Sequence, residues 1–272
     1  MKKNTTELWN SYWEKSPRST REDKFNHILL ENSIIWQRIE AIVSEHFGSF
    51  DGLKVLEIGS GVGSASALFA QRGSNVTLLD YSEHALKMSK DYFERNNLTA
   101  NVILQNALKI PTDLHNQFDI SLSFGLTEHF LGKDRIAINR AHFDVIKNNG
   151  MTFILVPNKH NPPYRLCKFV AELFRFWKVG EEYPYSRKEL KKICEIIGIS
   201  NFFFIGDSLA GSFSFWLNPV RYIKSFFKIT PSYDIDRIRK QKGCFLDQYF
   251  SYGLCLCGKK QAPANALFSN NR

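Results

Sequence analysis

The sequence predicts an α/β protein with a seven-stranded, mostly parallel sheet and helices on both faces. Short apolar runs alternate with amphipathic segments from residue 53 to residue 206, as in strands joined by crossover helices. A glycine-rich loop follows the first of these runs, where a chain can turn sharply from a strand into a helix. The 272 residues, of which 43% are hydrophobic, suffice for one large domain with a substantial core.

Each predicted strand is followed by a turn or by the start of a helix. The strands are expected at residues 55–58, 75–79, 101–104, 118–124, 151–156, 201–205 and 249–257. The helices between them are expected at residues 64–72, 82–96, 133–147 and 186–197. Gly73 ends the first of these helices, Ser82 is the N-cap of the second, and Ser186 with Glu189 forms a capping box for the last.

The first 52 residues are predicted to be an N-terminal helical segment that precedes the first strand. Residues 23–47 have the apolar periodicity of one long helix packed on the sheet. Residues 7–15 carry large apolar side chains spaced as on one helical face, which predicts a flap or lid over the pocket: Leu8, Trp9, Tyr12 and Trp13.

The remainder of the chain is expected to form one domain over residues 53–260. The alternation of strands and helices lapses at residues 158–185 and 207–243, which are predicted to be helical or irregular insertions that set substrate choice. Residues 261–272 are polar and are predicted to be a disordered tail.

The glycine loop at residues 59–63 is typical of a nucleotide-type cofactor site, and its details distinguish two kinds of cofactor. A dinucleotide fingerprint requires the pattern G-x-G-x-x-G/A. Counted from Gly59, its third position falls on Ser64, whereas the glycine comes one residue earlier, at Gly63. The carboxylate of Glu57, two residues before the loop, would repel a pyrophosphate and favours a cationic ligand that carries an amino group.

The run Glu57-Ile58-Gly59-Ser60-Gly61-Val62-Gly63 resembles the first motif of the class I S-adenosylmethionine-dependent methyltransferases, in their small-molecule branch. The resemblance implies a Rossmann-like fold and S-adenosylmethionine as the cofactor, with S-adenosylhomocysteine as the product. It also implies that Glu57, Gly59, Ser60, Gly61 and Gly63 hold the methionine part of the cofactor, which bears an ammonium and a sulfonium. These motifs cover most of residues 53–156.

Further cofactor contacts are expected at the ends of the second and third strands. Asp80 lies about twenty residues after the loop, where a carboxylate can accept both ribose hydroxyls, although an aspartate in a helix-entry turn would also stand there. Tyr81 is expected beside the adenine. Many members of the family have an aspartate after the third strand that binds the adenine amino group; here Asn106 and Ala107 occupy that place, and the Asn106 amide oxygen can accept instead.

The stretch from Phe118 to Phe130 resembles the fourth-strand motif of the same branch, which often ends in Glu-His. The resemblance implies that Phe124 and Gly125 line the cofactor beside the transferable methyl group. His129 has a pKa suited to a general base for a substrate hydroxyl. The alternative is that Glu128 and His129 cap the next helix or hold the loop.

A second signature, Asn161-Pro162-Pro163-Tyr164, is that of methyltransferases acting on adenine N6 and related amide nitrogens. In those enzymes it follows the fourth strand, whereas here it follows the fifth. A proline turn after a strand explains these residues without a function.

Composition adds little about partners. The net charge of +9 is compatible with an anionic partner, but the positive residues are spread along the chain. The five cysteines are predicted to be reduced thiols, with Cys255 and Cys257 in the core, and no metal is expected. The N-terminus has no apolar signal core, so a cytoplasmic protein is expected.

Methyl transfer to a hydroxyl, amine or carboxylate of a small, partly apolar metabolite is therefore the leading hypothesis. Three alternatives remain open at this stage. One is a lipid or lipid-linked acceptor at a membrane surface, suggested by the basic and aromatic residues 213–228, which could form an interfacial helix. The others are a nucleic-acid-binding or modifying protein, disfavoured by the scattered charge, and an NAD-dependent dehydrogenase. Neither the acceptor atom nor the oligomeric state follows from the sequence.

Overall fold

Seven strands form one sheet in the computed structural model, which describes residues 5–15, 20–174, 180–213 and 242–261. The order across the sheet is β3-β2-β1-β4-β5-β7-β6. Strands β1 to β5 pair in parallel, and β7 runs antiparallel to both of its neighbours. The predicted fold class is confirmed. The strands are β1 (Lys54–Ile58), β2 (Asn75–Asp80), β3 (Asn101–Leu104), β4 (Phe118–Phe124), β5 (Ile146–Pro157), β6 (Phe202–Gly206) and β7 (Gly253–Lys259).

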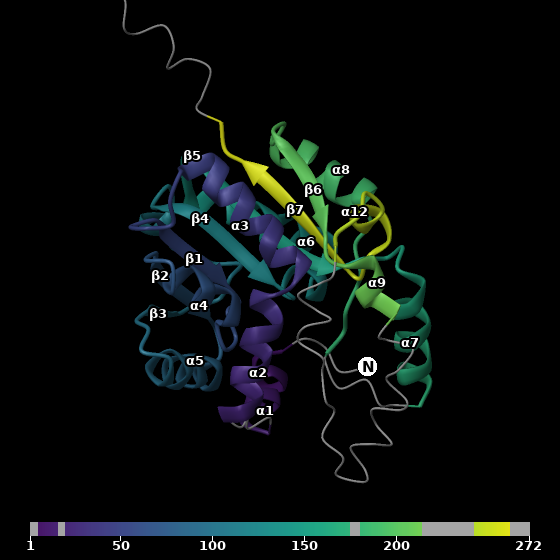
Figure 1. Cartoon of the computed structure of the whole chain (residues 1–272), viewed down its shortest axis with the longest axis horizontal. Helices are drawn as coiled ribbons and strands as arrows, with labels where there is room; N and C mark the ends of the chain where they lie inside the picture. The colour runs from purple at the N-terminus through teal and green to yellow at the C-terminus, as the bar shows by residue number, and fades with distance from the viewer. Residues whose placement is uncertain (1–4, 16–19, 175–179, 214–241, 262–272) are drawn as a thin grey trace, which may run out of the picture.

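Helices lie on both faces of this sheet and beyond its edge (Figure 1). In Figure 1, α3 crosses in front of the strands, and α1 and α2 lie below them. The α-helices are α1 (Thr6–Glu14), α2 (Thr20–Glu31), α3 (Ile34–Phe47), α4 (Ser64–Ala70), α5 (Glu83–Arg95), α6 (Gly132–Val145), α7 (Pro162–Leu173), α8 (Arg187–Ile197), α9 (Leu209–Ser212) and α12 (Asp247–Phe250). Short 3-10 helices cover Thr112–Leu114 and Thr127–His129.

The alternation of side chains along the strands builds a core on each face of the sheet. On one face, residues of β1, β2, β4, β5 and β7 pack with α3, α4 and α5. Cys255 and Cys257 of β7 point to this face and are fully buried, and all five cysteines are free thiols, as predicted. On the other face, α6 and α8 cover residues such as Leu56 and Ile154. A sheet buried on both faces is what the long apolar runs require.

The predicted N-caps Ser82 and Ser186 are observed, whereas α4 ends at Ala70 with Gln71 as its C-cap, before the predicted Gly73. Ser82 Oγ accepts from the Ala85 N–H at the start of α5, and Ser186 Oγ accepts from the Glu189 N–H at the start of α8. The Glu189 side chain turns to Arg135 of α6 at 2.7 Å. It therefore joins the two helices that cover one face of the sheet.

Several predicted boundaries are wrong for local reasons. Residues 23–47 form two helices because Ser33 takes an extended conformation and caps α3, accepting from the Trp36 N–H at 3.2 Å. Strand β5 begins at Ile146 and follows α6 directly, five residues before its predicted start at Met151. The last strand begins at Gly253, because residues 247–250 form α12.

The predicted insertions are described in part. Residues 158–185 contain the regular helix α7 and an isolated bridge between Asn158 and Tyr185. Of the segment 207–243, residues 214–241 lie outside the described part of the chain, as do residues 262–272 of the predicted tail. Within the described residues, no helix is long and apolar enough to cross a membrane.

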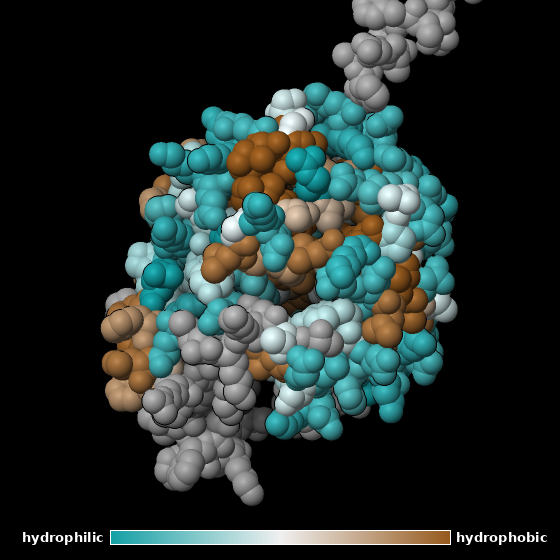
Figure 2. Space-filling model, turned by 180° about the vertical axis from the view of Figure 1, so that it is seen from behind, coloured by the Kyte–Doolittle hydropathy of each residue, from teal (hydrophilic) through white to brown (hydrophobic). Residues whose placement is uncertain are grey.

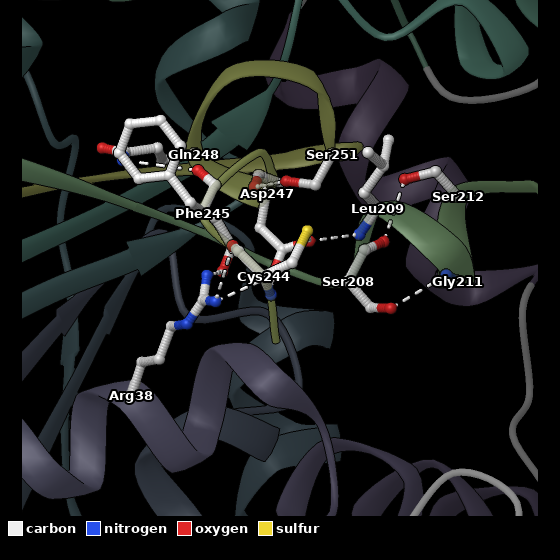
Figure 3. A network of polar contacts seen from close by, with 12 residues as sticks. Arg38, Ser208, Leu209, Gly211, Ser212, Cys244, Phe245, Asp247, Gln248 and Ser251 are labelled. Carbon is white, nitrogen blue, oxygen red and sulfur yellow. Dashed lines mark hydrogen bonds and ion pairs between the residues drawn. The ribbon is translucent and has the colours of Figure 1, made fainter. Parts of the chain in front are cut away.

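An ion pair fastens α3 to the segments on either side of residues 214–241 (Figure 3). Arg38 of α3 donates to Asp247 Oδ2 at 2.7 Å and to the Gly206 carbonyl at 2.7 Å. Asp247 also accepts from the backbone N–H groups of Leu209 and Cys244, at 2.9 and 2.6 Å. One buried carboxylate thus joins α3, the start of α9 and the loop before α12.

Candidate functional site

A cavity of about 990 Å³ lies at the carboxyl ends of the parallel strands. Its volume is at the upper end of the range of roughly 300–1,000 Å³ that is usual for ligand sites. All twelve residues that the sequence analysis selects line this one cavity: Glu57, Gly59, Ser60, Gly61, Gly63, Asp80, Tyr81, Asn106, Ala107, Phe124, Gly125 and His129. Parallel strands bring these separate segments together because their carboxyl ends share one edge of the sheet.

The glycine loop shapes the wall of the cavity between β1 and α4. Gly61 has a φ of +54° and Gly63 a φ of +76°, in the left-handed region that favours glycine. Gly63 begins α4 without a side-chain cap, so N–H groups of the first turn are left for other acceptors. A Cβ built on Gly61 would lie 2.8 Å from the Trp13 ring, which shows how closely the loop is approached.

Two buried carboxylates stand on either side of the loop. Glu57 Oε2 accepts from the Ser66 N–H at 3.2 Å, and burial raises the pKa of Glu57 from 4.5 to about 7. Asp80 Oδ2 accepts from the Gly61 N–H and Oδ1 from the Ser82 N–H, both at 2.9 Å, and burial raises the pKa of Asp80 as well. Asp80 therefore supports the helix-entry turn and the glycine loop at the same time. The Tyr81 N–H also interacts with this carboxylate, whose two oxygens offer about four acceptor positions, so one remains for a ligand hydroxyl.

Among the other predicted cofactor residues, Asn106 and Tyr81 already make hydrogen bonds within the protein. Asn106 Oδ1 accepts from the Leu108 N–H at 2.8 Å in a local turn, so the predicted acceptor for an amino group is already used once. The Tyr81 hydroxyl points to the Thr5 carbonyl at 3.4 Å. Gly125, with a φ of +83°, turns the chain out of β4 beside Phe124.

The cavity fits the cationic cofactor that the sequence motifs imply. Two buried carboxylates would oppose a pyrophosphate but complement an ammonium and ribose hydroxyls. The Ser60 hydroxyl is buried, and among the described residues it has no hydrogen-bond partner. Glu57, Ser60 and Asp80 are thus the polar groups on this wall that would hold S-adenosylmethionine.

The far end of the cavity is formed by Glu128, His129 and their neighbours. His129 Nδ1 is 2.8 Å from the Glu181 carbonyl oxygen, and burial lowers the pKa of the ring. The Glu181 and Gly125 carbonyls both interact with the ring and raise its pKa, which opposes the larger effect of burial. Burial raises the pKa of Glu128 to about 8. The bond to Glu181 shows that His129 also holds the loop, so both predicted roles are compatible with its geometry.

The sequence analysis selected none of the other residues at this end individually. Glu181, Glu182 and Tyr183 line the cavity from the segment before α8, and Tyr252 lines it from just before β7. The first three fall in the segment 158–185 that was expected to set substrate choice. Tyr252 carried no local signal, since it reaches the site only because β7 runs antiparallel beside β5.

Three potential metal ligands meet here, although no metal was expected. Ligand atoms of Glu128, His129 and Glu182 lie within 4.8 Å of one another. The Lys168 ammonium is 3.6 Å from Glu182 Oε2 and donates to the Glu182 carbonyl at 2.8 Å. This positive charge already balances the acidic cluster and opposes a second cation.

The signature Asn161-Pro162-Pro163-Tyr164 begins a helix and does not line the cavity. Asn161 Oδ1 caps α7 by accepting from the Tyr164 N–H at 2.8 Å, and its Nδ2 donates to the Phe250 carbonyl. The Tyr164 hydroxyl donates to Glu182 Oε2 at 3.1 Å. The residues thus support the cavity wall from behind, and the structural explanation accounts for them.

Comparison with known proteins agrees with this geometry. A family model described as a methyltransferase domain matches residues 55–150. The ubiquinone biosynthesis O-methyltransferase of Rickettsia typhi is 24% identical over 65% of this chain and 68% of its own. The protein of the same name from Pseudomonas aeruginosa is 26% identical over 55% of this chain and 68% of its own.

Solved structures show the same fold. The magnesium protoporphyrin IX methyltransferase of Synechocystis, crystallised with S-adenosylhomocysteine, superposes with a TM-score of 0.56 over 94% of both chains, at 14% identity. Such low identity concerns the fold alone. The matched domain, the relatives named above and the motifs at the strand ends agree with one another. Residues 55–150 are a methyltransferase domain, and the chain is similar in sequence motifs and in fold to the class I S-adenosylmethionine-dependent methyltransferases.

Proposed function

We propose that this protein transfers the methyl group of S-adenosylmethionine to a hydroxyl of a small, partly apolar metabolite in the cytoplasm. One observation carries the proposal: a single cavity joins the glycine loop and its carboxylates to a second end with His129. Relatives that are named O-methyltransferases favour an oxygen acceptor over an amine, and His129 as a base favours a hydroxyl, since a carboxylate needs no proton removed. Tyr183, Tyr252 and Leu131 on the cavity wall suit an acceptor with an apolar part.

The side chains have separate tasks in this reaction. The bound cofactor supplies an electrophilic methyl group on a sulfonium. Asp80 and Glu57 fix one end of the cavity, so that alignment of the acceptor with the methyl group supplies much of the rate. His129 takes the hydroxyl proton, and the Glu181 carbonyl, 2.8 Å from Nδ1, orients the ring. A lowered pKa keeps this imidazole neutral and ready to accept a proton.

The proposal is tested with the purified chain and a panel of matched acceptors that carry a phenolic hydroxyl, an amine or a carboxylate on the same ring. We expect formation of S-adenosylhomocysteine with the hydroxyl compounds, and a methyl group on oxygen by mass spectrometry. Replacing His129→Gln should lower kcat by about 10²–10⁴ with little change in the Kd of S-adenosylhomocysteine. Methylation of the amines alone, or an unchanged kcat, contradicts the proposal.

A second candidate, a lipid-linked acceptor at a membrane surface, is favoured by the exposed face of α7. Large apolar residues at positions spaced three, four and seven apart are between 42% and 65% exposed: Leu166, Phe169, Val170, Leu173 and Phe174. The opposite face of the same helix is buried and polar at Lys168. In the reversed view of Figure 2, α7 lies at the left edge, where apolar residues gather. Such a face suits the interfacial region of a bilayer.

This candidate is tested by flotation with vesicles of phosphatidylglycerol and phosphatidylcholine. Co-flotation that is lost in Phe169→Ser/Leu173→Ser, and retained in the control Glu172→Gln on the same helix, would support it. Absence of co-flotation removes it. The interfacial helix predicted at 213–228 lies outside the described residues except for Phe213, so the test relies on α7.

A further inference from the structure

The N-terminal helix α1 lies across the cavity and contacts both of its ends. Five residues of this segment line the cavity: Thr5, Glu7, Trp9, Tyr12 and Trp13. We propose that α1 is a movable wall of the cofactor site, in which Trp13 contacts the cofactor over Gly61, Trp9 contacts the acceptor beside His129, and Asn10 latches the helix to Ser82.

Trp13 stands at the cofactor end. Its Cζ2 and Cη2 atoms lie 2.8 and 2.9 Å from where a Cβ on Gly61 would be, so the indole packs directly on the bare backbone of the loop. The cofactor motif places its ligand against this same backbone. The ring therefore stands where the ligand is expected to contact the loop, so α1 must shift as the ligand enters, and the π face of the ring can then stabilise the cationic groups of the cofactor.

Trp9 stands at the other end and is joined to Trp13 by a continuous row of rings. The Trp9 and His129 rings are 4.8 Å apart in an edge-to-face arrangement. Tyr12 lies between the two tryptophans, with centroid distances of 5.6 Å to Trp9 and 5.1 Å to Trp13. One helix thus presents a single aromatic wall to the cofactor and to the proposed base. This wall would exclude water from both.

Two hydrogen bonds join the N-terminal segment to the residues that follow Asp80. Ser82 Oγ donates to Asn10 Oδ1 at 2.6 Å, and the Tyr81 hydroxyl points to the Thr5 carbonyl at 3.4 Å. Tyr81 follows Asp80 directly, and Ser82 is the N-cap of α5. The latch is therefore formed by the residues next to the proposed ribose contact. Exchange of the cofactor requires that these bonds open, because α1 covers the loop.

The central experiment measures binding of S-adenosylhomocysteine without any acceptor. Calorimetry should give a Kd about tenfold higher in Trp13→Ala, as expected for the loss of one aromatic contact with a cation, and near the wild-type value in Trp13→Phe. Stopped-flow tryptophan fluorescence should show dissociation about three- to tenfold faster in Asn10→Ala, the scale of one lost hydrogen bond. Ser11→Ala, on the same helix but not on the cavity, is the matched control.

These measurements distinguish a failure of the proposed role of α1 from a failure of the proposed hydroxyl methylation. Unchanged or tighter binding in Trp13→Ala overturns the wall, as does an unchanged dissociation rate in Asn10→Ala, when circular dichroism shows both variants folded. Trp9→Ala should raise the KM of the acceptor while leaving the Kd of S-adenosylhomocysteine unchanged; an unchanged KM overturns the contact assigned to Trp9. Because the binding measurements use no acceptor, they stand even if the hydroxyl assignment fails.

Discussion

Replacing Glu57→Gln should make the protein more stable and weaken its hold on the cofactor. The Glu57 side chain is buried, and the Ser66 N–H donates to its Oε2 at 3.2 Å. Desolvation of this carboxylate outweighs that hydrogen bond, so the pKa rises from 4.5 to about 7. A glutamine has the shape of the protonated acid and can accept the same bond.

The expected gain in stability follows from the raised pKa of Glu57. At 1.36 kcal/mol for each tenfold change in proton affinity, ionised Glu57 costs the folded state about 3 kcal/mol. The sign depends on pH. Below 4.5 the carboxyl is protonated in the folded and the unfolded chain, and the cost is absent. It grows as pH rises from 4.5 to about 7 and is complete above that.

Urea unfolding at a series of pH values measures this cost. We expect the free energy of unfolding of Glu57→Gln to exceed that of wild type by about 3 kcal/mol above neutral pH, with the gap closing as pH falls. The exposed Glu94→Gln on α5 is the control and should show no gap. A gap that is absent above neutral pH, or that does not change with pH, refutes the argument from desolvation.

The same substitution should raise the Kd of S-adenosylhomocysteine by about 10- to 100-fold, because a charge-assisted bond to its ammonium group is lost. For wild type, affinity should rise as pH increases through about 7, where Glu57 ionises. Calorimetry at several pH values checks both statements. Equal affinity in the two proteins would remove Glu57 from the cofactor site while leaving the stability prediction intact.

Four other changes have defined outcomes. Gly61→Val should abolish measurable binding of S-adenosylhomocysteine by calorimetry, since a Cβ would meet Trp13 at 2.8 Å, whereas Gly52→Ala, with nothing within 4 Å, should bind normally. Asp80→Asn should raise the Kd of S-adenosylhomocysteine by about tenfold or more, because one charged acceptor is lost. Equal Kd values in the variant and the wild type would contradict the ribose contact. Arg135→Met should lower the free energy of unfolding by about 1–3 kcal/mol in urea, since the buried guanidinium donates to Glu189 and to the Phe130 and Tyr183 carbonyls. Treatment with EDTA should leave activity unchanged; loss of activity that Mg²⁺ or Zn²⁺ restores would show that a cation is required.

The parts of the site that the sequence predicted are those that local motifs encode. Glu57, Asp80 and Phe124 stand at the ends of strands recognisable from short apolar runs, and parallel pairing brings such ends together. The aromatic spacing of residues 7–15 also predicted a helix over the pocket, and α1 lines it. Periodicity and strand order suffice for these features because they need no knowledge of distant contacts.

The features that the sequence analysis did not predict depend on contacts between distant segments or on local side-chain hydrogen bonds. Tyr252 and Glu182 reach the cavity through the antiparallel strand β7 and through α7, whose docking cannot be read from spacing. The bond from the Leu108 N–H to Asn106 Oδ1 was also not predicted, and it leaves the second lone pair of that oxygen for the expected ligand contact. The break at Ser33 was missed because the apolar periodicity continues across it, while the N-cap bond to Trp36 ends the helical register.

The buried carboxylates lower the stability of the folded chain and also suit the site to a cationic cofactor. Glu57 and Asp80 both have raised pKa values, so the chain without ligand holds carboxylates that burial disfavours. A cationic ligand favours the ionised form of both, and so it recovers free energy that the empty fold lacks. A dinucleotide would add negative charge to the same place. The electrostatics that destabilise the fold therefore also select the cofactor, and α1 shields that interaction from water.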